Sequence, residues 1–390
     1  MVIAARRQIG QWGLIAVAIT ATGGPLALAA LYAPELLGAA NPSAGFVALL
    51  APILFLGPVA IWWWYARRET SSGGLYSYVR TAAGRRVAWV QAGLWILSYA
   101  LYLLYTTEYI VYDILSSTFP GIRPYRPWLE ILIPIAIALI VLGGRAVMIG
   151  AVAVLAIGQL ALVVALAILT IGHDAPASSF QPTAPAHAIA TASAGIALLF
   201  VCGSLPLYLG GEARNGTRTL PRALIVGFLV TAVAIVIAVF PIAANPAFTR
   251  AEIPGASIAR VFGGPGWGYA IGAGVAASVA GVMIIEYVAL TRLVHAVTGW
   301  SVRMVTWVVA GLLALSGPVS LIDPDEFYDS LIRPSLIALW ASQILAVAVF
   351  PFYVRRFRPV RLWHWLVTAA ATAILAYGLY LNIVHTGAAS

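Results

Sequence analysis

Charge is scarce in this sequence, and lysine is absent from it. Only 9% of the 390 residues are charged, and all 22 basic residues are arginine. Hydrophobic residues make up 62% of the chain, whereas soluble domains carry about 25% charged residues. These figures exclude an ordinary soluble protein, and they exclude a disordered chain, which needs low hydrophobicity. The chain is long enough for about ten or more membrane spans of roughly 20 residues each.

Cysteine is almost as rare, and its scarcity limits the chemistry. The single cysteine, Cys202, excludes an intrachain disulfide and a cysteine-based metal cluster. The five histidines have no metal-ligand spacing, and neither a P-loop nor an activated serine or cysteine motif occurs. The net charge of +9 comes from short arginine clusters between apolar runs, which is not the pattern of a nucleic-acid binder. We therefore expect a protein that is not an enzyme and has no metal or cofactor.

Eleven apolar runs predict eleven transmembrane helices. The runs must be helical because lipid offers the backbone no hydrogen-bond partner. They lie near residues 13–33, 46–64, 87–115, 128–142, 146–171, 190–209, 223–243, 268–294, 305–322, 327–352 and 362–384. We expect a multi-pass protein of the cell membrane.

The distribution of arginine predicts the orientation of these helices. If the N-terminus is cytoplasmic, 17 of the 22 arginines fall in cytoplasmic connections and five on the external side. The positive-inside rule expects such an imbalance. Because the number of helices is odd, the C-terminus is then external.

Two of the apolar runs contain glycine close to proline near mid-membrane. The first run contains the segment Thr20–Pro25, and the sixth contains Val201–Pro206. Proline removes a backbone donor and glycine relaxes the helix, and such breaks are tolerated where they line a cavity. A simple proline kink is the alternative for either break alone. Two breaks five helices apart, however, occupy matching places in two inverted halves, which is typical of a transporter's substrate site.

Four segments, in order along the first eight helices, carry a resemblance to a known family. Thr22–Pro25 is a glycine-rich interruption, and Ser71–Tyr78 reads Ser-Ser-Gly-Gly-Leu-Tyr-Ser-Tyr. Gly211–Arg222 contains Glu-Ala-Arg-Asn-Gly-Thr-Arg-Thr-Leu-Pro-Arg, and Thr291–Val297 reads Thr-Arg-Leu-Val-His-Ala-Val. Together they resemble the amino acid–polyamine–organocation (APC) superfamily of permeases. The sixth helix departs from many relatives because Gly203-Ser204-Leu205 lacks their carboxylate.

The resemblance implies an all-α polytopic membrane protein with the LeuT-like fold. In that fold, two five-helix repeats are inverted relative to each other, helices 1 and 6 are broken, and this chain would have about 11 transmembrane helices. The first repeat would cover residues 1–172, an external linker 173–189 and the second repeat 190–353. Residues 354–390 would then add a C-terminal transmembrane helix.

The broken helices predict a site for a zwitterion. Free N–H groups after a break bind anions, so we assign a substrate carboxylate to the backbone of Thr22, Gly23 and Gly24. Carbonyls at a half helix that stops accept hydrogen bonds from an ammonium group. We assign the amine to carbonyls near Ala21, Val201 and Cys202, beside Gly203 and Ser204 in the second break.

The family register adds side chains from helix three and helix six. It implies that Ser98, Tyr99 and Tyr102 face the substrate, although aromatic residues on such a helix are more often packing residues. It also implies that Phe200 closes the site as an aromatic lid.

Two polar residues in apolar helices are candidates for ion coupling. Glu286 lies in helix eight, six residues before Arg292, and a charge at that depth is unfavourable. A salt bridge to Arg292, or access for water, is the structural alternative. Gln159 lies midway along helix five, near the place where some proton-coupled relatives have a lysine. Since lysine is absent, Glu286 is the candidate proton carrier.

These observations predict a permease that moves an amino acid or related amine by alternating access, coupled to protons or exchanging substrates. Its partners would be that small molecule, a proton or a counter-substrate, and the lipid bilayer. Two alternatives fit the same residues: a transporter of a cationic amine or polyamine, and a non-transporting sensor or partner subunit on the same fold.

Overall fold

The computed structural model describes residues 8–171, 177–244 and 246–384, and this part of the chain is almost wholly helical. Within it, eleven helical stretches are long and apolar enough to cross a membrane, which confirms the predicted number. We call them spans 1 to 11, and η marks a π- or 3₁₀-helical stretch.

The first five spans contain α1 (Gln11–Ala21), α2 (Pro25–Ala27), η1 (Leu28–Tyr32) and α3 (Ala33–Ala39) in span 1; α4 (Ala44–Leu54) and α5 (Leu56–Arg68) in span 2; α7 (Arg85–Glu108), η2 (Tyr109–Leu115) and α8 (Ser116–Thr118) in span 3; η3 (Pro120–Tyr125) and α9 (Arg126–Leu142) in span 4; and α10 (Arg145–Ile171) in span 5.

The other six spans contain α11 (Ala186–Leu198) and η5 (Val201–Glu212) in span 6; α12 (Gly216–Ala244) in span 7; α14 (Pro265–Thr298) in span 8; α15 (Val302–Ser320) in span 9; α16 (Pro324–Ala348) and α17 (Phe350–Arg355) in span 10; and α18 (Leu362–Val384) in span 11. The connections carry the shorter helices α6 (Leu75–Ala83), η4 (Ala177–Phe180), η6 (Pro246–Arg250) and α13 (Pro254–Gly263).

Span 1 is interrupted where the sequence predicts. α1 ends at Ala21, and Gly23 and Gly24 follow with φ angles of +82° and +66°. Only glycine enters this region of backbone space without a steric penalty. Pro25 then starts the second half at a position where its missing N–H is harmless. The break is therefore a change of backbone conformation rather than a proline kink.

Span 6 is interrupted in a different way. Its α-helix stops at Leu198, and after Leu199 and Phe200 the chain continues as the 3₁₀-helix η5, which is 12 residues long. Runs of 3₁₀-helix longer than three or four residues are uncommon. Pro206 lies inside η5 and cannot donate a backbone hydrogen bond. The second half of span 6 is thus narrower and more extended than an α-helix.

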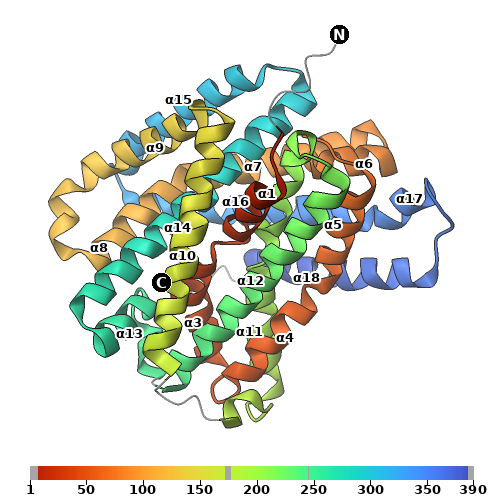
Figure 1. Ribbon diagram of the computed structural model, residues 1–390. Helices are drawn as coiled ribbons and strands as arrows, with labels where there is room; N and C mark the ends of the chain where they lie inside the picture. The colour runs from red at the N-terminus through yellow and green to blue at the C-terminus, as the bar shows by residue number, and fades with distance from the viewer. Residues whose placement is uncertain (1–7, 172–176, 245, 385–390) are drawn as a thin grey trace.

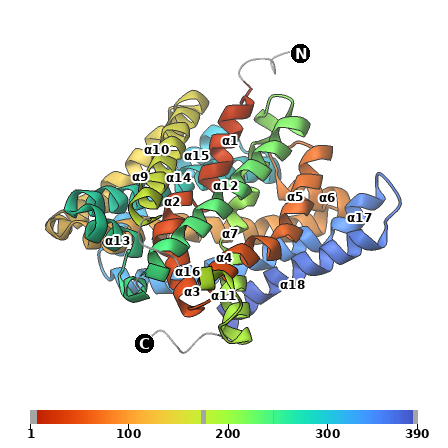
Figure 2. The same ribbon diagram turned by 60° about the horizontal axis from the view of Figure 1, so that its bottom comes forward.

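Spans 1 and 8 form the centre of the bundle. In each, 83% of the most apolar 18-residue window is buried, against 28% for span 11. Small residues permit this close packing: a Cβ on Gly227 of α12 would lie 2.7 Å from the carbonyl oxygen of Ala18, and one on Gly281 of α14 would lie 2.8 Å from Thr20. Figure 1 shows α1 surrounded by α10, α12 and α14, and Figure 2 shows α17 and α18 as a pair at one edge of the bundle.

The connection between spans 2 and 3 packs on the end of span 6. Gly74 has a φ of +50°, and a Cβ there would lie 2.5 Å from the ring of Tyr208. A Cβ on Gly211 would likewise lie 2.4 Å from Ser72 Oγ. The Ser-Ser-Gly-Gly and Gly-Gly-Glu segments are therefore complementary surfaces, which explains the glycines in two of the four family-like motifs.

The predicted external linker is partly helical. Ser43 Oγ, at the start of span 2, accepts hydrogen bonds from the N–H groups of Thr183 and Ala184, both at 2.8 Å. Residues 172–176 of that linker lie outside the described residues, and α11 begins at Ala186, before the predicted second repeat.

Candidate functional site

A cavity of about 320 Å³ lies between the two broken spans. Gly23 and Leu28 line it from span 1, and Val201 and Cys202 line it from span 6. Spans 3, 8 and 10 close the remaining sides. The cavity therefore lies at the interruptions themselves, where backbone groups that an intact helix would use internally become available.

Aromatic side chains dominate the cavity wall. Five tyrosines line it: Tyr32, Tyr102, Tyr105, Tyr109 and Tyr328. Tyr32 and Tyr109 stack with their ring centroids 6.4 Å apart, and Tyr109 stacks on Tyr328 at 5.6 Å. Tyr32 belongs to the π-helical turn η1 and Tyr109 to the π-helical turn η2. π-helical turns often occur at functional sites, and both of these place a tyrosine in the same cavity.

Four of the predicted substrate residues line the cavity: Gly23, Tyr102, Val201 and Cys202. The others surround it without lining it. Ser98 is buried, and its carbonyl oxygen accepts a hydrogen bond from Ser335 Oγ at 2.9 Å. Tyr99 packs on Trp95, with ring centroids 4.0 Å apart.

Phe200 is fully buried and packs between Phe55 and Phe228, at centroid distances of 5.9 and 4.8 Å. It is absent from the cavity wall. The aromatic residues on the wall come instead from spans 1, 3 and 10.

The N–H groups of the first break have backbone partners in this conformation. Thr22 N–H donates to the carbonyl of Ala18 at 3.2 Å, Gly23 N–H to that of Ala21 at 2.7 Å, and Gly24 N–H to that of Thr20 at 3.1 Å. Thr22 Oγ1 also donates to the Ala18 carbonyl, at 2.7 Å. A carboxylate that bound these N–H groups would have to replace those contacts.

The two breaks lie against each other. A Cβ on Gly203 would lie 3.5 Å from the Thr22 side chain. Gly203 N–H donates to the Phe200 carbonyl at 2.9 Å, and Ser204 Oγ accepts from Gln343 Nε2 of span 10 at 3.0 Å. The Ser204 hydroxyl is thus bonded to span 10, and it donates in turn to the Val201 carbonyl at 3.3 Å.

Glu286 is fully buried behind the cavity wall. Cys202 Sγ lies 3.8 Å from Glu286 Oε1 in a geometry that lets the thiol donate, and Tyr99 Oη donates to the same sulfur at 3.9 Å. Glu286 Oε2 has no hydrogen-bond partner among the described residues. The carboxyl group therefore contacts the broken part of span 6 through one residue, and that residue lines the cavity.

Gln159 connects the first break to spans 5 and 8. Its Nε2 donates to Thr20 Oγ1 at 3.2 Å, and its Oε1 accepts from Ser278 Oγ at 2.7 Å. Ser278 Oγ in turn lies 3.4 Å from the N–H of Ala27, in the half helix after the break. Both halves of span 1 are therefore attached to one hydrogen-bonded chain of neutral side chains.

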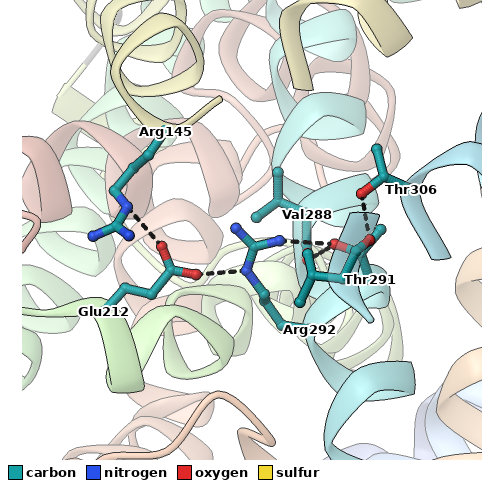
Figure 3. Close-up of polar contacts among 7 residues, drawn as sticks. Arg145, Glu212, Val288, Thr291, Arg292 and Thr306 are labelled. Atoms are coloured by element: carbon teal, nitrogen blue, oxygen red, sulfur yellow. Dashed lines mark hydrogen bonds and ion pairs between the residues drawn. The ribbon is translucent and has the colours of Figure 1, made fainter. Parts of the chain in front are cut away.

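Arg292 does not pair with Glu286, so the salt bridge weighed in the sequence analysis is absent. Arg292 Nε lies 2.5 Å from Glu212 Oε1, and Arg145 Nε lies 2.9 Å from Glu212 Oε2 (Figure 3). Glu212 ends η5, Arg145 begins α10 and Arg292 lies near the end of α14. One carboxylate thus joins spans 5, 6 and 8.

Ile9, which precedes span 1, is bound next to the ion pairs of Glu212. Its N–H donates to the Glu212 carbonyl at 2.8 Å, and its carbonyl accepts from Arg214 N–H at 2.9 Å. The start of span 1 and the end of span 6 are therefore joined at one end of the bundle, next to the ion pairs of Glu212.

Sequence reasoning missed Tyr32, Tyr105, Tyr109 and Tyr328. The signal for two of them was present, because Tyr102, Tyr105 and Tyr109 recur at helical spacing and continue the predicted stripe of span 3. Tyr32 and Tyr328 had no such signal, since their spans meet span 3 only in the tertiary structure. Glu212 was part of a quoted motif, but the sequence did not indicate its two partners.

Solved structures with this arrangement exist. A crystal structure of MhsT in complex with L-phenylalanine is similar to the chain with a TM-score of 0.65 and 16% identity, covering 97% of this chain and 99% of that one. A Na⁺-coupled sialic acid symporter, in a substrate-bound outward-open state, is similar with a TM-score of 0.62 and 11% identity, covering 98% and 91%. The chain has the LeuT-like fold. The sequence itself matches no protein-family model and no curated protein.

The LeuT-like fold accounts for the two breaks, because the similarity covers nearly the whole of this chain. It confirms the predicted all-α polytopic membrane architecture with inverted five-helix repeats, broken spans 1 and 6 and about 11 spans, whereas the residue bounds of the repeats and of the C-terminal addition stay predictions. Among the described residues, no group of three or more histidine, cysteine, aspartate or glutamate side chains is arranged to hold a metal ion.

Proposed function

We propose that this protein is a secondary active transporter that moves an amino acid or related amine across the cell membrane by alternating access. The observation that carries the proposal is the cavity between the two broken spans, lined by Gly23, Cys202 and five tyrosines. Its volume of about 320 Å³ suits a small molecule, since ligand cavities of about 300 Å³ and above are typical.

The composition of the cavity supports an aromatic or large apolar amino acid. Leu28, Leu198, Leu199, Val279 and Val282 supply apolar surface, and the tyrosines supply aromatic faces and hydroxyl groups. Among the described residues, no arginine lines this cavity. Tyrosine faces attract an ammonium group by the cation–π interaction. A cationic amine is the second candidate, and Glu286 behind Cys202 is the observation that favours it.

Two polar groups support a hypothesis about coupling. Glu286 is the candidate proton carrier, because its carboxyl group is buried and contacts the cavity-lining Cys202. Gln159 and Ser278 hold the two halves of span 1 with neutral groups. We infer that Gln159 stabilises the break without a bound cation, and that Glu286 exchanges a proton during the cycle.

The orientation is part of the proposal. Cytoplasmic placement of the N-terminus puts the Glu212 ion pairs and Ile9 on the cytoplasmic side, and the C-terminus outside. In a Cys202→Ser background, a cysteine at Ser178 should react with an impermeant external thiol reagent, and one at Ser72 should not. Labelling at Ser72 without labelling at Ser178 would reverse the orientation. Ala388, which would test the C-terminus, lies outside the described residues.

Uptake into proteoliposomes tests the proposed function. The purified protein is reconstituted and challenged with a panel of labelled neutral and cationic amino acids and amines, with and without a pH gradient. We expect saturable accumulation of a subset that includes a large neutral amino acid. Binding without uptake would favour the sensor alternative, and conversion of a substrate to a new compound would favour a membrane enzyme.

A further inference from the structure

Two further cavities, which share no lining residue with the cavity at the breaks, are basic and aromatic. The first, of about 460 Å³, is lined by Trp63, Trp64, Arg67, Arg68, Arg358 and Trp363. The second, of about 350 Å³, is lined by Trp63, Arg67, Thr217, Arg218, Pro221 and Arg222. Trp63 and Arg67 belong to both, so the two cavities adjoin.

Three connections that are separate in the sequence meet here. Trp63 to Arg68 end span 2, Arg358 and Trp363 flank the turn into span 11, and Arg218 and Arg222 lie in the first turns of α12. Figure 2 shows α17 and α18 as a pair at one edge of the bundle, and α5 packs against α18. The cavities therefore lie at the ends of transmembrane spans, at one edge of the bundle.

Three arginines of these cavities, Arg67, Arg68 and Arg358, stack on aromatic rings. The guanidinium carbon of Arg67 lies 4.7 Å from the Trp63 ring centroid, and that of Arg358 lies 5.0 Å from Trp64 and 5.5 Å from Trp363. Stacking on a ring leaves the N–H edge of a guanidinium group available for an anion, although one terminal nitrogen of Arg358 also lies 3.0 Å from His364 Nε2.

No carboxylate in the described part of the chain neutralises them. The ion pairs found there all belong to Glu212, which pairs with Arg145 and Arg292. The nearby Glu69 accepts hydrogen bonds from Thr81 Oγ1 at 3.4 Å and Tyr353 Oη at 3.3 Å. Five arginines, at positions 67, 68, 218, 222 and 358, thus surround two adjoining cavities without an acidic partner.

The second cavity has an additional attraction for anions. It lies at the first turn of α12, which begins at Gly216 and is 29 residues long. The N–H groups of Arg218 and Thr219 donate to the Asn215 carbonyl at 2.8 and 3.1 Å, so the attraction comes from the positive end of the helix dipole. Basic pockets at the ends of transmembrane helices bind the headgroups of acidic phospholipids.

The surface next to the cavities is apolar. On α18, Leu362 is 73% exposed and Leu366 is 59% exposed, next to the half-exposed Trp363. Tryptophan at this level is typical of the membrane–water interface. A ligand with phosphate in the basic cavities and acyl chains along α18 would contact both the arginines and the exposed apolar residues. A free phosphate would contact the arginines only.

We propose that these two cavities form a binding site for an acidic phospholipid whose headgroup carries two phosphates. Cardiolipin is a phospholipid of this kind. One phosphate occupies the cavity of Arg67, Arg68 and Arg358, and the other occupies the cavity of Arg218 and Arg222. The acyl chains lie along the exposed face of α18. This site is independent of the proposed substrate cavity.

Native mass spectrometry of the purified full-length protein tests this proposal. Cardiolipin, phosphatidylglycerol and phosphatidylethanolamine are titrated separately in a nonionic detergent. We expect cardiolipin to bind most tightly and to raise the melting temperature most, because a ligand of the folded state stabilises it. Equal binding of cardiolipin and phosphatidylglycerol would overturn the assignment of two phosphates, and equal binding of phosphatidylethanolamine would overturn the site.

Substitutions locate the site. The double variant Arg67→Gln/Arg358→Gln should bind cardiolipin roughly 30-fold more weakly, given the usual contribution of an arginine at an acidic membrane surface. Arg355→Gln/Arg356→Gln is the matched control, because it removes the same charge from exposed residues that line neither cavity. Equal loss in the two double variants would overturn the proposal in favour of general charge attraction.

Two further measurements test whether a loss of binding comes from misfolding and whether the ligand is a lipid or a free phosphate. Arg222→Gln changes one exposed arginine, and it should reduce the preference for cardiolipin over phosphatidylglycerol while the unliganded melting temperature is kept. If Arg222→Gln changes neither the preference for cardiolipin nor the affinity, the second cavity is not part of the site. Inorganic phosphate at millimolar concentration should not displace the lipid, and full displacement would identify a site for a free phosphate instead.

Discussion

The thiol of Cys202 lies 3.8 Å from the carboxylate of Glu286. This contact connects the only cysteine of the chain, in the interrupted part of span 6, to a fully buried carboxyl group in span 8. Glu286 has no cationic partner among the described residues, because the nearest arginine in sequence, Arg292, pairs with Glu212. A carboxyl group so placed needs a proton, a cation or water, and the cavity next to Cys202 can supply each of them.

Glu286→Gln keeps the size of the side chain and its contact with Cys202 but fixes it in a neutral state. If Glu286 carries the coupling proton, the variant should lose pH-dependent accumulation and retain exchange of substrate for substrate. If it pairs with a cationic substrate, it should weaken binding of that substrate and spare neutral ones. Accumulation and exchange in proteoliposomes, with affinities from binding, distinguish the two.

Glu130→Gln is the matched control for that experiment. Glu130 is also a buried carboxyl group, but it accepts a hydrogen bond from Ser320 of span 9 at 3.2 Å, away from the cavity. We expect wild-type coupling in this control. Wild-type accumulation, exchange and affinity in Glu286→Gln would remove both functional roles of Glu286.

Cys202 should report occupancy of the cavity without any engineered label, because it is the sole cysteine and lines the cavity wall. A saturating substrate should slow its alkylation by about tenfold or more, as expected when a ligand covers most of its own surface in a site. The rate is measured by mass spectrometry. Cysteine at the exposed Ser178 in a Cys202→Ser background is the control, and its rate should be independent of substrate. Unchanged alkylation of Cys202 at saturation would place the substrate elsewhere.

Gly24→Ala should damage the first break far more than Gly203→Ala damages the second. A Cβ on Gly24 would lie 2.2 Å from Ser278 Oγ, and its φ of +66° disfavours any other residue. A Cβ on Gly203 would meet Trp62 at 3.4 Å, an ordinary contact. We expect Gly24→Ala to lose substrate affinity and about 1 to 3 kcal/mol of stability from strain. Equal effects of the two variants on affinity and thermal unfolding would contradict this explanation.

Gln159→Leu tests whether the hydrogen-bonded chain that holds span 1 matters for function. It leaves Thr20 and Ser278 without their amide partner, so stability should fall by about 1 to 3 kcal/mol. Gln91→Leu removes another buried amide, which joins spans 3 and 10 through Ser342 at 3.0 Å. Both variants should lower the melting temperature, and only Gln159→Leu should change substrate affinity. If the two lower affinity alike, the effect comes from general destabilisation.

Glu212→Gln should weaken the junction of spans 5, 6 and 8. The neutral amide cannot pair with both Arg145 and Arg292, so we expect a loss of about 1 to 3 kcal/mol, as for hydrogen bonds to charged groups. We also expect faster alkylation of Cys202 in inside-out vesicles, because the end of span 6 is released on that side. Arg303→Gln removes an exposed charge from a surface cavity that Arg145 and Arg292 also line, and it should leave the rate unchanged. A slower alkylation rate in Glu212→Gln would show that the ion pairs of Glu212 do not close this end of the protein.

The sequence by itself determined the class of the protein and the position of its breaks. Eleven apolar runs must be helices in lipid, and they recur as the eleven spans. The segment Thr22–Pro25 determined the first break, because only glycine takes the φ angles found at positions 23 and 24. The register implied by the family resemblance also put Tyr102 at the substrate site, and Tyr102 lines the cavity.

Only the tertiary structure decided which groups meet. Arg292 lies six residues after Glu286 in the sequence, yet it pairs with Glu212, 80 residues away. Tyr32 and Tyr328 reach the tyrosines of span 3 from helices whose own patterns carry no such signal. Trp63 and Arg67 meet Arg222 and Arg358 in the same way. Periodicity specifies one face of one helix, whereas the partner of that face depends on how the helices pack, and this is a property of the whole chain.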